Sequence, residues 1–389
     1  MNLSIGIVGM PNVGKSTLFN ALLKKTVAYA ANYPFATIEP NVGVVEVPDA
    51  RLPVLAKIVN TTKIVPAAVE FYDIAGLVKG ASTGEGLGNK FLSHIREVAA
   101  IAHVVRLFED PKIIHVANKV DPISDIQTVE TELILSDMTT LSKQHEPKGK
   151  ASKEEIFLYG VVQKLEKKMD EGIPARNIGL EDDEKEAVKQ LNLLTMKPVI
   201  YVFNVSENQL GNIEETKKKI EEILSRLNSH SGERRDSRID AGQARLAEAT
   251  AKRASMTNYI YLNAKLENDV LALSPEDQKA YLQEYGLEET GLNRLIKTAY
   301  STLGLISFLT GGEKEVRAWT ITKGTLAPQA AGTIHTDFEK HFIKADVVPF
   351  KDFVELGGWV KARELGKVQS TGKDYVMKDD EVVEFKVGV

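Results

Sequence analysis

The sequence contains no cysteine, and that absence excludes several kinds of chemistry at once. Without thiols the chain can form no disulfide, offer no thiolate nucleophile and build no cysteine-based zinc site. It also lacks any run of about 18 consecutive apolar residues, so we expect no membrane-spanning segment. The opening stretch MNLSIGIVGMPNVGKS has no basic flank ahead of an apolar core, so we expect no signal peptide. These absences together favour a soluble, cytoplasmic protein.

A strong net charge of either sign is also missing. The 389 residues include 49 basic and 54 acidic side chains, which leaves a formal net charge of −5. A chain this balanced does not coat nucleic acid by bulk charge, so any RNA contact needs a local basic patch. The length exceeds what one hydrophobic core usually serves, which predicts two or three domains.

Short apolar segments rich in valine and isoleucine alternate with helical patterns along much of the chain. The strand-like segments are residues 3–8, 42–47, 69–72, 102–108, 199–203 and 259–262. Because helices intervene between several of them, we predict an α/β fold with a mostly parallel sheet and helices on both faces. This nucleotide-binding domain is expected to cover residues 1–126 and 197–302.

Two other regions differ in character from this alternation. Residues 127–196 are dense in Glu, Lys and Leu and carry two amphipathic series, which predicts an inserted α-helical coiled-coil hairpin, with a solvated face of no binding role as the alternative. Residues 303–389 predict a small α+β domain, with a strand at 316–322, a helix opened by a capping box at Thr336 and running through Lys344, and strands near 374–377 and 382–387. The polar, arginine-bearing residues 227–256 favour a surface insertion over an RNA-contacting arm.

Residues 9–16, GMPNVGKS, match the phosphate-binding pattern G-x-x-x-x-G-K-[ST] between an expected strand and an expected helix. Its glycines let backbone N–H groups converge on phosphate oxygens, and the helix adds the positive end of its dipole. We expect Lys15 to reach the β- and γ-phosphates and Ser16 to coordinate Mg²⁺. The other predicted nucleotide contacts here are Asn12, Val13, Gly14 and Thr17.

Two further motifs follow in the order that a nucleotide switch requires. Asp73 to Gly76 forms D-x-x-G at a strand end, where the carboxylate can hold Mg²⁺ through water and the Gly76 N–H can bond the γ-phosphate. Thr37 lies in the loop where a threonine closes over the metal, with a purely structural role as the alternative.

The group that orients the attacking water is harder to identify. Many GTPases use a glutamine directly after D-x-x-G, but Leu77 stands there and cannot orient water. His94, His103 and His115 are the candidates that remain, and the residues alone favour none of them.

The stretch Asn118 to Asp121 spells N-K-V-D, which is the guanine-reading motif of GTPases. Parallel strands need a crossover of about a dozen residues. Because the strand predicted at 102–108 ends too close to Asn118, that asparagine is not expected on the next parallel strand. The alternative, one long helix over 90–108, conflicts with the β-branched and aromatic content there.

A better base-binding candidate is residues 197–207, KPVIYVFNVSE, a buried-looking strand that ends in N-x-x-E. Asn204 and Val205 are expected at the base. Guanine presents two donors to an aspartate at the fourth position, and Glu207 is longer and shifts that geometry, so guanine selectivity weakens and ATP becomes plausible. Asn263 and Ala264 are expected to flank the base from the other side.

Several stretches closely resemble the YchF/Obg-like ATPase family: GMPNVGKS, FATIEPN, DIAGLVKGASTGEGLGNKFLSHIRE, NVSE and EVRAWTITKGTLAPQAAGTIHTDFEKHFIKAD. The resemblance runs over residues 1–389. It implies a TRAFAC-class G domain, an inserted coiled-coil helical domain and a C-terminal TGS domain of β-grasp shape. It also implies a preference for ATP over GTP, association with ribosomal RNA or protein, and His115 as the catalytic histidine. Asn12 resembles the asparagine of potassium-activated relatives, so stimulation by K⁺ is a hypothesis.

The sequence thus predicts a monomeric, ribosome-associated ATPase that uses Mg²⁺ and acts as a nucleotide-dependent switch in translation. Two alternatives stay open. One is an Obg-type GTPase in ribosome assembly. If N-K-V-D reads the base, a preference for GTP over ATP is expected again. The other is a nucleotide-gated binding module with negligible turnover.

Overall fold

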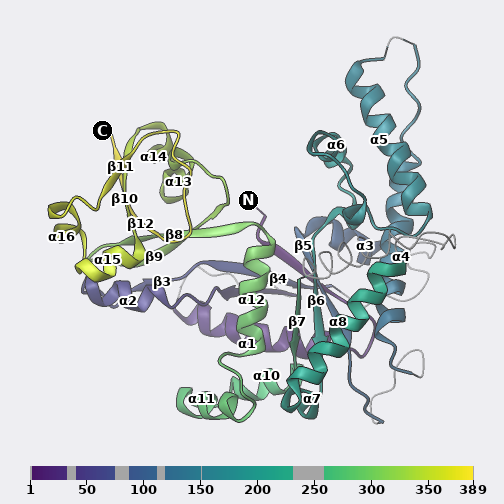
Figure 1. The fold of residues 1–389 in the computed structure, drawn as a ribbon, viewed down its shortest axis with the longest axis horizontal. Coiled ribbons are helices and arrows are strands. Elements are labelled where there is room, and N and C mark those ends of the chain that lie inside the picture. The colour runs from purple at the N-terminus through teal and green to yellow at the C-terminus, as the bar shows by residue number, and fades with distance from the viewer. Residues whose placement is uncertain are drawn as a thin grey trace, which may run out of the picture. The chain divides into compact units, whose positions relative to one another are not determined.

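The computed structural model describes residues 2–32, 41–74, 87–111, 119–149, 151–230 and 258–388. The chain forms two compact units (Figure 1). One comprises Met1–Gly43 and Glu70–Leu295, and the other comprises Val44–Val69 and Ile296–Val389. Among the described helices, none is both long and apolar enough to cross a membrane.

The first sheet has six strands in the order β2-β4-β1-β5-β6-β7. Their bounds are β1 Ser4–Val8, β2 Val42–Glu46, β4 Ala68–Asp73, β5 Ala100–Arg106, β6 Val199–Asn204 and β7 Tyr259–Leu262. The five strands from β4 to β7 pair in parallel, so the predicted mostly parallel α/β sheet is confirmed. Every residue of β1 and β5 is buried, which explains their continuous apolar sequences.

The edge strand β2 runs against the others. The Asp73 N–H donates to the Asn41 carbonyl at 3.1 Å, and the Val47 N–H donates to the Ala67 carbonyl at 2.8 Å. The partners' numbers change in opposite directions along the two segments, which is the pattern of an antiparallel pair. Between β2 and β4 the chain passes through the helix α2 Arg51–Ile58 and the short strand β3 Ile64–Val65.

Several helices surround this sheet. They are α1 Lys15–Asn32, α3 Leu87–Glu97, α7 Glu207–Gly211, α8 Ile213–His230, α10 Ala264–Val270, α11 Pro275–Glu284 and α12 Gly291–Thr302. Val105 and Phe203 of the central strands share one buried cluster with Ile220 of α8 and Leu266 of α10. This cluster fixes the carboxyl ends of β5 and β6, where the loops that form the site begin.

A helical segment is inserted between β5 and β6. It contains α4 Pro122–Leu141, α5 Lys153–Asp170 and α6 Asp182–Val188, with the short 3₁₀ helices η1 Ala175–Asn177, η2 Lys189–Leu191 and η3 Leu194–Met196. The two long helices share a core that includes Leu141 and Leu165, and Figure 1 shows them side by side. The helix α4 begins at Pro122 because Asp121 caps it, accepting a hydrogen bond from the Ser124 N–H at 3.1 Å. The aspartate of N-K-V-D is therefore a helix cap.

Buried polar contacts fix this insertion to the chain that re-enters the sheet. The Asp137 carboxylate accepts hydrogen bonds from the Leu194 N–H at 2.8 Å, the Thr195 N–H at 2.8 Å and the Thr195 hydroxyl at 2.7 Å. Burial raises the pKa of Asp137, although these three donors oppose the rise. The Tyr201 hydroxyl of β6 donates to Glu130 of α4 at 2.9 Å. These hydrogen bonds connect the base of the hairpin to β6, the strand that ends at Asn204.

The second unit holds a mixed six-stranded sheet in the order β11-β10-β12-β8-β9-β3. Its strands are β3 Ile64–Val65, β8 Leu305–Gly311, β9 Val316–Thr322, β10 Phe342–Pro349, β11 Gln369–Thr371 and β12 Glu381–Val387, and its helices are α2 Arg51–Ile58, α13 Ala327–Ile334, α14 Thr336–Lys340, α15 Phe350–Leu356 and α16 Trp359–Glu364. Phe308, Ile321, Ala330 and Val347 belong to the core between sheet and helices. The strands expected at 316–322 and 382–387 are both present.

Two local predictions for this unit are wrong. The N-cap of α14 is His335 rather than Thr336, and its ring accepts a hydrogen bond from the Asp337 N–H at 3.3 Å. The helix ends at Lys340 because the chain enters β10 at Phe342 and pairs with β12, so it does not run through Lys344. The strand expected at 374–377 is only a single bridge between Leu326 and Val376. The strand that pairs with β10 at this edge of the sheet is β11.

Candidate nucleotide-binding site

The loop between β1 and α1 has a backbone that only glycine permits at two positions. Gly9 has φ +151° and Gly14 has φ +102°. A Cβ at Gly9 would lie 2.4 Å from the Val104 carbonyl oxygen, and a Cβ at Gly14 would lie 2.2 Å from Nδ2 of Asn204. The glycines of the phosphate-binding pattern therefore serve close packing as well as access to the backbone N–H groups.

The side chain of Lys15 folds back over this loop. It is only 8% exposed, and its Nζ donates to the carbonyls of Gly9 at 2.9 Å and Met10 at 2.7 Å. Burial lowers the pKa of Lys15 to about 8, while the nearby Asp73 carboxylate acts in the opposite direction. Burial also raises the pKa of Asp73, and Lys15 opposes that rise. A bound phosphate would supply the counter-charge that this ammonium group requires.

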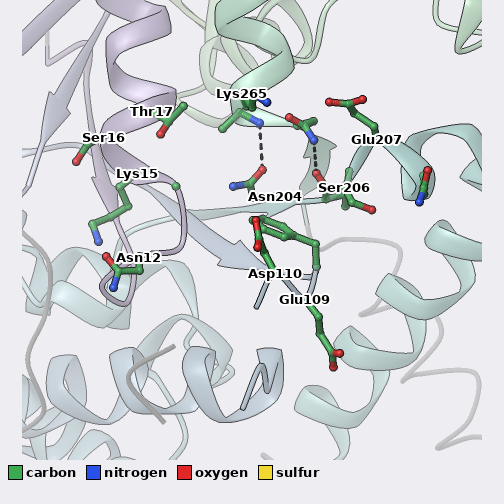
Figure 2. Close-up of a pocket in the computed structure, with 16 residues that line it drawn as sticks. Asn12, Lys15, Ser16, Thr17, Glu109, Asp110, Asn204, Ser206, Glu207 and Lys265 are labelled. Atoms are coloured by element: carbon green, nitrogen blue, oxygen red, sulfur yellow. Dashed lines mark hydrogen bonds between the residues drawn. The ribbon is translucent and has the colours of Figure 1, made fainter. Parts of the chain in front are cut away.

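A cavity of about 700 Å³ opens beside the loop, which is a volume suited to a nucleotide. Figure 2 shows the side chains around it. Its lining consists of Asn12, Gly14, Lys15, Ser16, Thr17, Phe108, Glu109, Asp110, Asn204, Val205, Ser206, Glu207, Asn208, Asn263, Ala264 and Lys265. These residues follow β1, β5, β6 and β7, because the carboxyl ends of parallel strands meet at one edge of a sheet.

Asn204 is the last residue of β6, and its side chain connects two of the loops that line the cavity. Its side chain is buried, its Nδ2 donates to the Val13 carbonyl at 2.9 Å, and its Oδ1 accepts from the Ala264 N–H at 3.0 Å. Asn263 makes a parallel connection, in which its Nδ2 donates to the Val205 carbonyl at 2.8 Å. The Asn204 amide joins the phosphate loop to the loop after β7, and the Asn263 amide joins the loops after β6 and β7; Figure 2 marks the bond that Asn204 accepts.

Glu207 occupies the first turn of α7. Ser206 caps that helix and accepts a hydrogen bond from the Gln209 N–H at 3.2 Å. The Glu207 side chain is exposed and lines the cavity, and Figure 2 shows it on the side of Asn204 away from Lys15. It is thus available to a ligand group at the end of the cavity opposite to the phosphate loop.

The loop after β5 was not predicted as part of the site. Phe108, Glu109 and Asp110 nevertheless line the cavity, together with Ser206 and Asn208. The signal was present in the sequence, because the predicted strand ends beside these residues and its neighbours in the sheet end at the same edge. Phe108 is half-buried and adds an aromatic surface to which a planar base can bind.

The candidate histidines divide into three cases. His103 lies inside β5 and is 2% exposed, and burial lowers its pKa to about 3, so it is a neutral packed residue that does not line the cavity. His94 is exposed on α3 and does not line the cavity either. His115 lies outside the described residues, as do Thr37, Gly76, Leu77 and Asn118.

The chain is similar to known proteins along its whole length. The family described as "50S ribosome-binding GTPase" matches residues 4–143, and the family YchF-GTPase_C, described as "Protein of unknown function (DUF933)", matches residues 305–388. The chain is similar to proteins named "Ribosome-binding ATPase YchF" from Bacillus subtilis, at 46% identity over 393 residues, and from Haemophilus influenzae, at 44% over 394 residues. Each alignment covers 100% of both chains.

A solved structure agrees with these relatives. The structure of the Schizosaccharomyces pombe YchF GTPase is similar to this chain with a TM-score of 0.81 at 36% identity, and the match covers 99% of this chain and 98% of that one. The likeness thus extends through the phosphate loop, the helical insertion and the second sheet. Full-length identity above 40% to several relatives and a shared fold place this chain in the YchF family of P-loop NTPases.

Proposed function

We propose that this chain binds ATP with Mg²⁺ in the cavity, hydrolyses it, and associates with the ribosome according to the bound nucleotide. The observation that carries the proposal is the buried Lys15, held over a glycine loop at the mouth of a cavity of about 700 Å³. The names of the full-length relatives, "Ribosome-binding ATPase YchF", support both the nucleotide and the partner.

The residues present fit a magnesium ion that binds together with phosphate oxygens. Ser16 is exposed and lines the cavity, and Asp73 is close enough to Lys15 for the two charges to affect each other's pKa. Among the described residues, no group of three or more His, Cys or Asp/Glu side chains could hold a metal alone. This suits Mg²⁺, which keeps several water and phosphate ligands. Ser16, Asp73 and Thr37 are the proposed protein ligands, and Asn12 the proposed K⁺ contact.

The division of labour along the cavity follows from its lining. Backbone N–H groups of the phosphate loop and the Lys15 ammonium would neutralise charge on the β- and γ-phosphates, which is the largest contribution that a protein makes to phosphoryl transfer. Asn204, Val205 and Glu207 would border the base from one side. Asn263 and Ala264 would border it from the other side.

We propose His115 as the residue that positions the attacking water. This assignment rests on resemblance to the family, as do the switch roles of Gly76 and Leu77. A general base of this kind contributes about 10²- to 10⁴-fold to the rate. If His115→Ala leaves ribosome-stimulated phosphate release unchanged, the assignment is withdrawn.

The proposed domain organisation places the nucleotide site at residues 1–126 and 197–302, the helical coiled-coil insertion at 127–196 and a TGS domain at 303–389. We propose that the insertion and the TGS domain carry the contacts with ribosomal RNA or protein, and that the protein acts as a monomer in the cytoplasm. The nucleotide would favour the state of these parts to which it binds more tightly.

The choice between ATP and GTP is the first matter to test, because the relatives' names disagree: some say ATPase, others GTPase. We expect fluorescent ATP to bind at least about tenfold more tightly than GTP, and Lys15→Ala to abolish binding of both. Phosphate release with and without ribosomes, and co-sedimentation with ribosomes in ATP or ADP, test turnover and partner. Tight GTP binding with weak ATP binding would favour the ribosome-assembly GTPase. Tight binding without turnover would favour a nucleotide-gated binding module.

A further inference from the structure

Arg106 is the largest fully buried side chain in the described part of the protein. It is the last residue of β5 and is 1% exposed. In the sheet it pairs with Asn204, the residue that braces the phosphate loop from the end of β6. A buried guanidinium is expensive unless its donors are satisfied, so its partners indicate what it is for.

Two of its partners lie in the cavity wall. The Arg106 Nε donates to the Phe108 carbonyl at 3.0 Å, and an Nη donates to the Asp110 carbonyl at 3.3 Å. The guanidinium carbon also lies 4.6 Å from the centre of the Phe108 ring. One planar group therefore holds both the backbone and the aromatic side chain of the loop formed by residues 108–110.

This loop lines the cavity and follows β5 directly. The residue before the loop is anchored twice. The Leu107 N–H donates to the Asn204 carbonyl at 2.9 Å, and the Leu107 carbonyl accepts from Gln209 Nε2 at 3.1 Å. Both anchors lie before Phe108. At Phe108 and Asp110 Arg106 holds the main chain of the loop through hydrogen bonds to both carbonyls.

We propose that Arg106 is a positioning residue that fixes Phe108, Glu109 and Asp110 as one wall of the base-binding end of the cavity, and so sets the affinity for the base of the nucleotide. The inference rests on the proposed nucleotide-binding function. Arg106 itself lies behind this wall and does not line the cavity. Its effect on a ligand therefore passes through the loop.

The chemistry of arginine explains why this residue type is used. A guanidinium presents several N–H donors in a rigid plane and can stack on an aromatic ring while it donates at its edge. A lysine at the same position keeps the charge but lacks the planar group that stacks on the Phe108 ring while it donates to carbonyls at its edge. Arg106→Lys is therefore a sharp test, because it removes geometry and retains charge.

The test compares two ligands that differ only in the base and sugar. We expect Arg106→Lys to raise the Kd for Mg-ATP by about tenfold, since one lost charged hydrogen bond weakens an ordered site by about this factor, and to change the Kd for Mg-tripolyphosphate by less than about twofold. In steady-state hydrolysis KM should rise while kcat changes by less than about threefold, because the interaction lost is made equally in ground and transition states.

A matched control is available in the same unit. Arg294 lies over the Tyr261 ring at 4.4 Å and donates to the Tyr261 carbonyl at 2.8 Å, but Tyr261 does not line the cavity. Arg294→Lys should destabilise the fold to a similar degree, measured by urea unfolding, and leave both Kd values within about twofold of wild type.

Three outcomes decide the matter. Selective loss of ATP affinity in Arg106→Lys supports the inference. Equal weakening of ATP and tripolyphosphate, or an unchanged ATP affinity, overturns it and leaves Arg106 as a residue of the sheet alone. Wild-type protein that binds tripolyphosphate but shows no preference for ATP over tripolyphosphate would overturn the proposed base site, and the role of Arg106 with it.

Discussion

The side-chain amide of Asn204 donates a hydrogen bond to the main-chain carbonyl of Val13 at 2.9 Å, which ties the end of β6 to the phosphate loop. The other end of the same amide accepts from Ala264. The asparagine that the sequence predicts at the base therefore also connects the phosphate loop to the loop after β7. A change at this residue should affect the architecture of the site as well as contacts with the ligand.

Replacement of Asn204 by alanine should weaken both stability and binding. Each buried partner left without a hydrogen bond costs about 1–3 kcal/mol, so we expect a clear fall in the free energy of unfolding and an increase of about tenfold or more in the Kd for ATP. Urea unfolding and nucleotide titration measure the two effects. Asn293→Ala is the control, because Asn293 accepts from Lys25 at 2.5 Å and does not line the cavity. Equal binding in the two variants would contradict the prediction.

Replacement of Gly14 by alanine should abolish nucleotide binding. Its φ of +102° disfavours any side chain, and the new Cβ would meet Nδ2 of Asn204 at 2.2 Å. Gly172→Ala is a matched control, since its φ of +84° imposes similar backbone strain while nothing lies within 4 Å of the added Cβ. The control should lose about 1 kcal/mol of stability and no affinity for ATP. If both variants lose only that amount, the close packing of Gly14 has no functional consequence.

The sequence was most informative where burial is complete. The strands β1 and β5 are buried along their whole length, so their apolar sequences identified them, and the parallel order placed their ends at one edge. Little in the sequence indicates β11, because Gln369 and Ser370 are exposed and polar and belong to the sheet only through pairing with β10. The support of Phe108 by Arg106 was equally hidden, since it depends on how a loop curves after its strand ends. Both features depend on contacts in three dimensions, which the periodicity of the sequence does not encode.

The pKa of Lys15 predicts a stability that depends on pH. The folded-state pKa of about 8 lies below the ordinary value of 10.5, so between these values the unfolded chain holds a proton that the folded chain has lost. Stability without nucleotide should therefore rise with pH across this window, relative to Lys15→Met, which lacks the group. Urea unfolding of both proteins at pH 7 and pH 10 measures the difference. A gap that stays constant with pH would show that Lys15 titrates normally.

The same ionisation should oppose phosphate binding at high pH. Because a bound phosphate favours the charged ammonium, the affinity of wild type for Mg-tripolyphosphate should fall as the pH rises through about 8, and binding should take up protons there. Calorimetry in buffers of different ionisation enthalpy measures this uptake. Lys15→Met should show weaker binding without the pH dependence.

The last prediction concerns the choice of base. Glu207 stands where guanine-binding proteins of this pattern use an aspartate, and it is exposed in the cavity lining at the first turn of α7. Glu207→Asp shortens the side chain and brings the carboxylate to the position from which it can accept both guanine donors. We expect the Kd for GTP to fall by about tenfold, as for one added charged hydrogen bond, while the Kd for ATP changes less.

Glu109→Asp is the control for this change. Glu109 is also exposed and also lines the cavity, but it follows β5 rather than β6, so the same shortening there should leave the ratio of GTP to ATP affinity unaltered. Parallel titration of both nucleotides against the two variants gives the four constants required. If Glu109→Asp shifts the ratio and Glu207→Asp does not, the base is read from the loop after β5, and the assignment of residue 207 to base selection is wrong.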